Sequence, residues 1–175
     1  MALKELSSAI RKYVSYRQRL RAGEQLPQDE MEDYYDHLDY ISLFLARKAG
    51  EKPAVTIRNG RSRTTLRVPA AVTAQLASSS DLRECMALNI SEGGIFLATD
   101  NPDLAPGTPV RLEIVLREEK SALKLSGVVQ WQSTGSESPL LSGIGIRFTG
   151  LTTAQKKALE QFVDGRTESL LDLLA

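Results

Sequence analysis

The sequence predicts a mainly β fold with α-helices: a six-stranded antiparallel β-barrel with a C-terminal helix, preceded by an N-terminal α-helical hairpin. Three observations lead to this prediction. Apolar residues recur every three or four positions up to residue 48, and they alternate with polar residues between 68 and 148. A helix-capping pattern then follows at Thr152. With 175 residues, the chain is long enough for one substantial core and a modest accessory element.

Two amphipathic helices are predicted first, over residues 2–22 and 28–48. Their apolar positions are Leu3, Leu6, Ile10, Tyr13 and Leu20, interrupted by Arg17, and then Met31, Tyr34, Leu38, Ile41 and Leu45. Gly23 can end the first helix in a left-handed conformation, and Pro27 stands near the start of the second. We therefore expect an antiparallel hairpin, in which the basic segment 4–21 faces the acidic segment 24–39.

Such a hairpin has little core of its own, so its spare apolar edge needs a partner. Two arrangements satisfy this need. The hairpin either braces the downstream domain within one chain or pairs with a second copy in a four-helix bundle, which would make a homodimer. The hairpin is also the surface that we expect to meet a protein partner.

After Gly50 the sequence predicts about six strands, because apolar residues alternate between turn-forming Ser, Asn, Pro and Gly clusters. This pattern is typical of an antiparallel barrel or sandwich, and we favour a small closed barrel. The expected inward positions are Val68, Ala70, Val72, Ala74, Leu76, Met86, Leu88, Ile90, Val110, Leu112, Ile114, Leu116, Leu123, Leu125, Val129, Trp131, Ile144, Ile146 and Phe148.

A final helix is predicted after the strands. Thr152 and Gln155 form a capping box, and an apolar stripe of Leu159, Phe162 and Val163 is expected to face the barrel mouth. Gly165 is expected to interrupt the helix and to leave a short helix or tail. The predicted organisation is a hairpin over 1–50, a linker over 51–62, a barrel over 63–150 and a helix or tail over 151–175.

Composition excludes several classes of function. Lys and Arg equal Asp and Glu at 22 each, which argues against a protein that coats nucleic acid non-specifically. No apolar run approaches the ~18 residues needed for membrane insertion, and no secretory signal is visible, so we expect a cytoplasmic protein. Cys85 and His37 are single, which leaves no disulfide and no Cys/His metal site. Without a catalytic constellation, we expect neither an enzyme nor a cofactor.

Two segments can carry binding chemistry. Arg61, Arg63 and Arg67 fall within seven residues, and in an extended chain the last two would lie on one side, roughly 13 Å apart at ~3.3 Å per residue. Guanidinium groups match phosphate oxygens and the edge of guanine bidentately, so guanine nucleotides suit this cluster. The alternative interpretation is that these arginines are solvated side chains of a linker.

The second segment is Asn89-Ile-Ser-Glu-Gly-Gly94, between two predicted strands. Asn89 and Ser91 are two residues apart and should leave the core together, opposite Met86, Leu88 and Ile90. Their polar groups can bond a guanine edge or a phosphate, while Gly93 and Gly94 leave room for a ligand beside the backbone. An ordinary hairpin turn is the alternative interpretation.

The two segments together resemble the paired Arg-x-x-x-Arg and Asp/Asn-x-Ser-x-x-Gly motifs of the PilZ domain family. Arg63 and Arg67 match the first motif, and Asn89, Ser91 and Gly94 match the second. Further similarity lies in Arg67-Val-Pro, Gly127-Val-Val-Gln-Trp and Gly143-Ile-Gly-Ile-Arg-Phe, so that the resemblance covers roughly residues 58–165. The helical hairpin lies outside it.

The resemblance implies a PilZ-like six-stranded barrel that binds bacterial cyclic di-GMP without catalysis, in second-messenger signalling such as motility or biofilm regulation. Arg61 lies outside the strict motif, and we add it as a phosphate ligand from its charge and proximity. We hypothesise that the ligand orders residues 52–66 and shifts the hairpin, which alters a partner interaction. The alternatives are a PilZ-like adaptor that binds no nucleotide and a small-barrel nucleic-acid binder.

Overall fold

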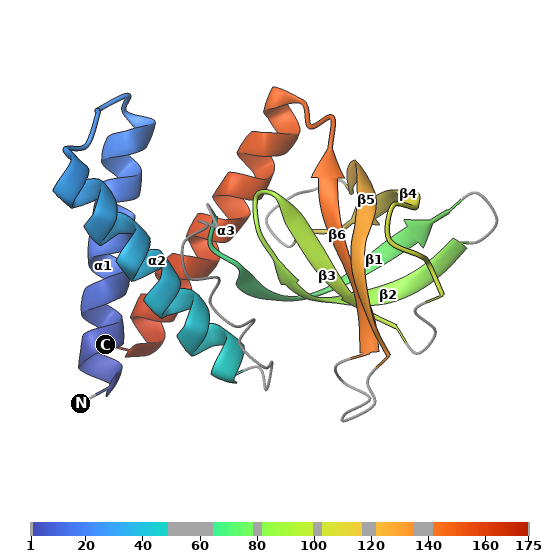
Figure 1. Cartoon of the computed structure of the whole chain (residues 1–175), viewed down its shortest axis with the longest axis horizontal. Coiled ribbons are helices and arrows are strands. Elements are labelled where there is room, and N and C mark those ends of the chain that lie inside the picture. Colours follow the sequence, from blue (N-terminus) through green and yellow to red (C-terminus); the bar gives the residue numbers. More distant parts are fainter. Residues whose placement is uncertain are drawn as a thin grey trace. The chain divides into compact units, whose positions relative to one another are not determined.

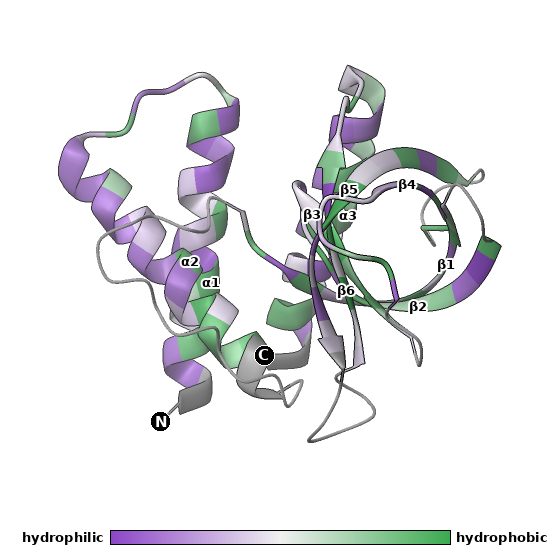
Figure 2. Cartoon of the chain, turned by 45° about the vertical axis from the view of Figure 1, so that its right-hand side comes forward, coloured by the Kyte–Doolittle hydropathy of each residue, from purple (hydrophilic) through white to green (hydrophobic). Residues whose placement is uncertain are grey.

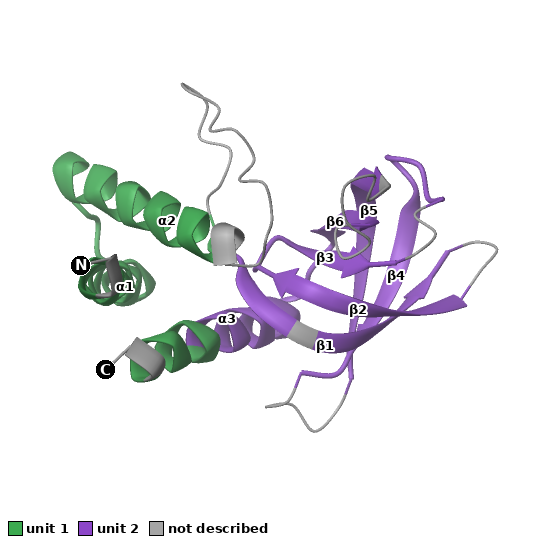
Figure 3. Cartoon of the chain, turned by 90° about the horizontal axis from the view of Figure 1, so that it is seen from below, with its two compact units in different colours: residues 1–66, 165–175 green, residues 67–164 purple. Residues whose placement is uncertain are grey.

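The computed structural model describes residues 2–48, 65–78, 82–99, 103–116, 122–134 and 142–174. Its chain runs through two helices, six strands and a final helix within these residues (Figure 1). The chain divides into two compact units (Figure 3). One unit is residues 67–164 and holds the strands; the other is residues 1–66 together with 165–175 and holds the N-terminal helices.

The unit over residues 67–164 is built on a closed barrel with the strand order β1–β2–β3–β6–β5–β4, and all neighbouring strands are antiparallel. The fold class predicted from the sequence is confirmed, as a closed barrel and not a sandwich. In the described part of the chain its strands are β1 Val68–Ala77, β2 Leu82–Ile90, β3 Gly94–Ala98, β4 Pro109–Ile114, β5 Leu123–Thr134 and β6 Ser142–Thr149.

Alternation along β1, β4 and β6 fills the barrel interior as predicted. The buried residues of these segments are Val68, Ala70, Val72, Ala74, Leu76, Val110, Leu112, Ile114, Leu116, Ile144, Ile146 and Phe148. Burying branched aliphatic side chains contributes about 1.5–3 kcal/mol each before the loss of chain entropy, so this interior holds the barrel together.

Two strands depart from the predicted alternation because each contains a β-bulge. In β2 the register shifts between Ala87 and Asn89, so Met86 is 54% exposed and Leu88 is only partly buried, although both were predicted to face inward. In β5 the register shifts between Val129 and Trp131, and Trp131 is 40% exposed on the outer face. An extra residue in one strand reverses the side to which all later side chains point.

The final helix, α3 Thr153–Leu174, begins at the predicted capping box. The backbone amide of Thr152 donates to Gln155 Oε1 at 2.7 Å, and the amide of Gln155 donates to Thr152 Oγ1 at 3.2 Å. Leu159, Phe162 and Val163 are buried, as expected of the apolar stripe. The predicted interruption at Gly165 is wrong, because α3 continues through this residue to Leu174.

The N-terminal helices are α1 Ala2–Arg21 and α2 Gln28–Lys48, within a residue of the predicted bounds. Gly23, at φ 83°, ends α1: its amide donates to the carbonyl of Leu20, and that of Glu24 donates to the carbonyl of Arg19. These bonds are those of a Schellman cap. Both helices carry hydrophilic and hydrophobic residues along their length, as Figure 2 shows.

Apolar and aromatic side chains join the two helices. The rings of Tyr13 and Tyr34 stack at 5.4 Å between centroids. Arg17, the predicted charged interruption, is buried, and its Nη1 donates to the hydroxyl of Tyr13 at 3.2 Å. The fully or nearly buried apolar residues of this pair of helices are Leu6, Ala9, Ile10, Tyr13, Tyr34, Leu38, Ile41 and Leu45.

Charges face each other across the hairpin, as the sequence predicts. Lys12 Nζ lies 3.4 Å from a carboxylate oxygen of Asp33, and Arg19 lies 2.8 Å from one of Glu30. The hydroxyl of Tyr16 donates to Asp33 at 2.8 Å, and this hydrogen bond is the main cause that lowers the pKa of Asp33. Exposed ion pairs of this kind each contribute little to the free energy of folding. Their main effect is to favour this alignment of α1 and α2.

Candidate functional site

The strand register places a continuous row of residues on the outer face of the barrel. Pro69 lies opposite Asn89, Asn89 opposite Phe96, Phe96 opposite Gly145, and Gly145 opposite Trp131. Because these positions alternate with inward-facing apolar residues, their side chains point away from the barrel core. The row therefore crosses β1, β2, β3, β6 and β5 on one side of the sheet.

A second row runs beside the first. Val68 and Ile90 form the last pair of the β1–β2 ladder, and Arg67 and Ser91 are the next residues at this end of the two strands. Each is two residues from an outward-facing position, Pro69 or Asn89, and so belongs to the outer side. Beyond the turn, Gly94 pairs with Arg147 on β6. We select seven residues of these two rows and call them the outer patch: Arg67, Asn89, Ser91, Gly94, Phe96, Arg147 and Trp131.

Asn89 and Ser91 leave the core together, as predicted. Ile90 between them is fully buried in the barrel, whereas the two polar residues belong to the outer side. The phase is correct although Met86 and Leu88 were misplaced, because the bulge before Asn89 reverses the alternation at that point. Both polar residues are largely covered, with 8% of Asn89 and 4% of Ser91 exposed.

The hydroxyl of Ser91 makes hydrogen bonds within its own turn. Ser91 Oγ donates to the carbonyl of Gly94 and accepts from the amide of Gly93, both at 3.3 Å. The amide of Ser91 also donates to the carbonyl of Gly94 at 2.8 Å. In addition, the amide of Phe148 donates to the carbonyl of Gly93 at 2.9 Å, which ties the turn to β6. Ser91 thus fixes the shape of the turn between β2 and β3.

Gly93 and Gly94 play different parts. Gly93 is exposed at the tip of the turn. A Cβ at Gly94 would collide with the backbone carbonyl of Ile146 on β6. The close approach of β3 and β6 therefore explains the glycine at position 94. The space for a ligand that the sequence predicted there is not needed as an explanation.

Among the predicted arginines, Arg67 is part of the outer patch and is partly exposed. Arg61 and Arg63 lie outside the described residues. Of the predicted set, the structure thus places Asn89, Ser91 and Gly94 around the β2–β3 turn and Arg67 directly before β1, whose first residue pairs with Ile90.

Arg147 is a cation of this face that the sequence analysis did not select. It is exposed on β6, between Gly94 of β3 and Val128 of β5. A signal was available, because Arg147 alternates with the inward residues Ile146 and Phe148 and follows two glycines on the outward side of the same strand.

An aromatic pair completes the outer patch. The rings of Phe96 and Trp131 stack at 5.0 Å with an angle of 13° between their planes. A Cβ at Gly145 would collide with the indole. One at Gly143 would collide with the backbone carbonyl of Leu97 and would also lie 2.8 Å from the tip of Phe96. Phe96 is buried, with 4% exposed, whereas Trp131 is 40% exposed. An exposed indole on the same face as guanidinium groups is suited to planar, anionic ligands such as nucleotides.

Cys85 and His37 take no part in this site. Cys85 is buried inside the barrel, and burial raises the pKa of its thiol, so that it is a neutral packing residue. His37 lies 3.3 Å from Asp33 in α2. Among the described residues, no group of three or more His, Cys, Asp or Glu is arranged to hold a metal ion.

The chain is therefore a small closed barrel with a capped C-terminal helix, a polar and aromatic outer face, and two preceding helices. A model of the PilZ domain matches residues 61–165, and the chain belongs to the PilZ domain family. The α1–α2 hairpin lies outside the match.

Solved structures share the fold. The Bacillus subtilis inhibitor of motility MotI/DgrA is 21% identical with a TM-score of 0.55, over 67% of this chain and 56% of that one. Escherichia coli YcgR in complex with c-di-GMP is 12% identical with a TM-score of 0.51, over 62% and 47%. Apo MrkH of K. pneumoniae is 17% identical with a TM-score of 0.50, over 64% and 51%.

The chain thus spans about half the length of these solved proteins. No curated protein matches the sequence. None of the helices that the structure describes has the length and apolar character needed to cross a membrane.

Proposed function

We propose that this protein is a cyclic di-GMP effector that binds the nucleotide on its outer patch. The observation that carries the proposal is the β1–β2 register, which pairs Val68 with Ile90 and so places Arg67 and Ser91 at the same end of the two strands, next to Asn89. Membership of the PilZ family supports a role in c-di-GMP signalling. YcgR of Escherichia coli, which shares the fold and was solved in complex with c-di-GMP, is consistent with such a role.

Each residue of the proposed site has its own task. Arg67, with Arg61 and Arg63 from the preceding segment, supplies guanidinium groups for phosphate and guanine. Asn89 offers an amide that can both donate to and accept from a second guanine. Ser91, Gly93 and Gly94 form the turn that presents Asn89, with Gly93 exposed beside the ligand.

The outer patch extends this proposal to residues beyond the two motifs. Arg147 adds a cation opposite Gly94, and the exposed face of Trp131 gives a base a surface on which to stack. Trp131 is the one tryptophan of the chain, so its fluorescence reports on this face.

The proposed output is conformational. The arginine segment lies in the chain between α2 and β1, so ligand that orders residues 52–66 can shift the helical hairpin and alter its contact with a protein partner. In this proposal the protein is a cytoplasmic signalling component, without catalysis and without any cofactor other than the bound nucleotide. Motility and biofilm control are the processes that fit such an effector.

One observation favours a second candidate, an adaptor of the same family that binds no nucleotide. The hydroxyl of Ser91 is engaged within its turn, and Gly94 is explained by the approach of β6, so these motif residues have structural reasons to be present. An adaptor would keep them for the turn alone.

Calorimetry on the full chain with cyclic di-GMP, beside GTP and cyclic AMP, separates the two candidates. The effector binds cyclic di-GMP selectively, and the fluorescence of Trp131 changes during the titration. Arg67→Ala should then weaken binding at least several-fold, because one bidentate guanine contact is worth about 1–3 kcal/mol.

Arg11→Ala is the matched control, because Arg11 is an exposed arginine of α1 outside the outer patch. Its affinity should equal that of the parent chain. Circular dichroism establishes that both variants are folded. If the parent chain binds no cyclic di-GMP, the adaptor is correct; if Arg67→Ala binds as tightly as the control, the nucleotide sits elsewhere.

A further inference from the structure

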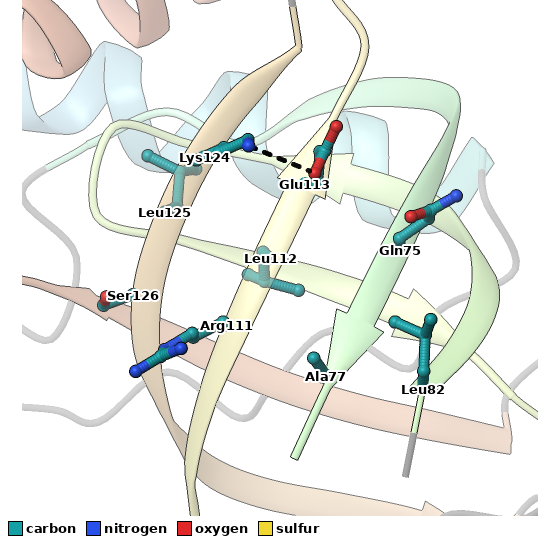
Figure 4. A pocket seen from close by; sticks show the side chains of 9 residues that line it. All are labelled: Gln75, Ala77, Leu82, Arg111, Leu112, Glu113, Lys124, Leu125 and Ser126. Atoms are coloured by element: carbon teal, nitrogen blue, oxygen red, sulfur yellow. Dashed lines mark ion pairs between the residues drawn. The ribbon is translucent and has the colours of Figure 1, made fainter. Parts of the chain in front are cut away.

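A groove with a volume of about 360 Å³ crosses the outer face of β2, β1, β4 and β5. It shares no residue with the outer patch. Two cations, Arg111 of β4 and Lys124 of β5, lie on one side of the groove in Figure 4, and Gln75 and Leu82 lie on the other. Glu113 of β4 lies beside Lys124, so the first side of the groove carries two cations and one carboxylate, and the opposite side contains an exposed apolar side chain.

The strand register fixes this arrangement. Ala77 pairs with Arg111, and Arg111 pairs with Ser126. In the next row Glu113 pairs with Lys124. Because these pairs alternate with the buried residues of the same strands, all five side chains belong to the outer surface.

The two cations are available to a partner. Arg111 is exposed and, within the part of the chain that the structure describes, makes no hydrogen bond or ion pair. Lys124 is 79% exposed, and its only ion pair among the described residues is with Glu113, at 4.0 Å. Such an exposed and distant pair is easily exchanged for another carboxylate. Leu82 is 68% exposed, so the apolar side is also uncovered.

The chain itself carries a complementary surface, which we call the acidic face of α2. It consists of Asp29, Glu32, Asp36 and Asp39, all exposed and spaced by three, four and three residues, so that they share one side of the helix. Gln28 donates a hydrogen bond to Glu32 at 3.1 Å, and none of the four carboxylates has an ion pair with a described residue.

This face points away from α1, because the residues of α2 that are buried in the hairpin, such as Leu38 and Ile41, lie on the opposite side of the helix. Like charges three and four residues apart repel one another along a helix. A cationic surface that covers them removes this repulsion. Tyr40, 37% exposed at the edge of the same face, can cover an apolar side chain such as Leu82.

We propose that the groove of one copy receives the acidic face of α2 of a second copy. Arg111 and Lys124 would pair with the carboxylates, and Leu82 would contact Tyr40. The two contacting surfaces differ, so the interface is heterologous, and copies either close into a ring or continue as a chain. The proposal does not depend on nucleotide binding.

Sedimentation velocity of the full chain tests the proposal over a wide range of concentration and at low and high salt. The mass should rise with concentration, and high salt should weaken association because the paired charges are exposed. Arg111→Glu with Lys124→Glu should raise the dissociation constant at least about tenfold, since attraction is replaced by repulsion. Asp36→Lys with Asp39→Lys should do the same.

Restoration is the decisive measurement. A mixture of the groove-reversed and helix-reversed proteins should associate again, because each carries the charge that the other now lacks. The chain with all four substitutions should also self-associate. Lys156→Glu with Lys157→Glu is the matched control: both lysines are exposed in α3, outside the groove, and the net charge changes by the same amount.

Three outcomes would overturn the proposal. The parent chain could remain monomeric throughout. The control could weaken association as much as the groove variant, which would leave only an effect of net charge. Finally, the groove variant could abolish association while the helix variant does not, which would assign the groove a different occupant.

Discussion

Gly145 shows how one absent side chain shapes the outer patch. The indole of Trp131 lies over this glycine and stacks on Phe96, and it occupies the space that a Cβ at position 145 would need. The two glycines of the Gly143-x-Gly145 segment are therefore packing features of β6.

Gly145→Ala should destabilise the barrel by about 1–3 kcal/mol, because the new methyl group must displace the ring. Urea unfolding followed by the fluorescence of the single tryptophan measures this loss. The same substitution in a Trp131→Ala chain, followed by circular dichroism, should cost clearly less, since the colliding ring is gone. Equal costs in both backgrounds would mean that Trp131 does not set the need for glycine.

Part of the outer patch could be predicted from the sequence, and the rest could not for a definite reason. Asn89 and Ser91 were placed on one side by their spacing of two, which holds locally whatever precedes it. Trp131 was wrongly predicted to face inward, because the prediction extended the alternation of β5 across the bulge that follows Val129. That bulge depends on how β5 pairs with β6, which is a property of the assembled sheet.

At the scale of elements, local signals fixed most boundaries. Gly23 ends a helix and the Thr152–Gln155 box begins one through hydrogen bonds that backbone amides donate to acceptors within six residues, so the sequence was sufficient to locate them. Gly165 is different. Phe162 and Val163 before it and Thr167 after it are all buried, and burial on both sides outweighs the modest helix propensity of one glycine.

A pair of Gly→Ala substitutions tests this view of the helices. Gly165→Ala should stabilise the protein by up to about 1 kcal/mol, because α3 is helical there and nothing lies within 4 Å of the added Cβ. Gly23→Ala also has open space but requires a φ of +83°, so it should destabilise by about 1 kcal/mol. Thermal unfolding by circular dichroism compares both; shifts of the same sign would contradict the argument.

At the scale of the whole molecule, the two units draw on different interactions. The barrel unit is held by an apolar interior in which every strand contributes. The unit with α1 and α2 includes a stacked pair of tyrosines, a buried arginine and several exposed ion pairs. Its stability should therefore respond to pH, whereas the apolar interior of the barrel has little reason to respond.

Tyr13 gives this response a direction. Burial is the main cause that raises the pKa of its hydroxyl well above the ordinary value, against a smaller opposing effect of Arg17. In the unfolded chain Tyr13 ionises at about pH 10, whereas in the folded chain burial keeps its hydroxyl neutral to a higher pH. Stability from the neutral, buried tyrosine is thus fully present below about pH 10 and is lost progressively as the pH rises beyond it.

Helical circular dichroism during urea unfolding, repeated between neutral and strongly alkaline pH, measures this loss. Tyr13→Phe should be less stable at neutral pH by about 1 kcal/mol, because the hydrogen bond from Arg17 is lost. It should also lose less stability than the parent chain above about pH 10, since no phenol remains to ionise at that position. Tyr16→Phe should also remove part of the alkaline loss, because the hydrogen bond that the Tyr16 hydroxyl donates to Asp33 raises the pKa of this phenol. If Tyr13→Phe declined as steeply as the parent chain, the alkaline response would have to originate in another group.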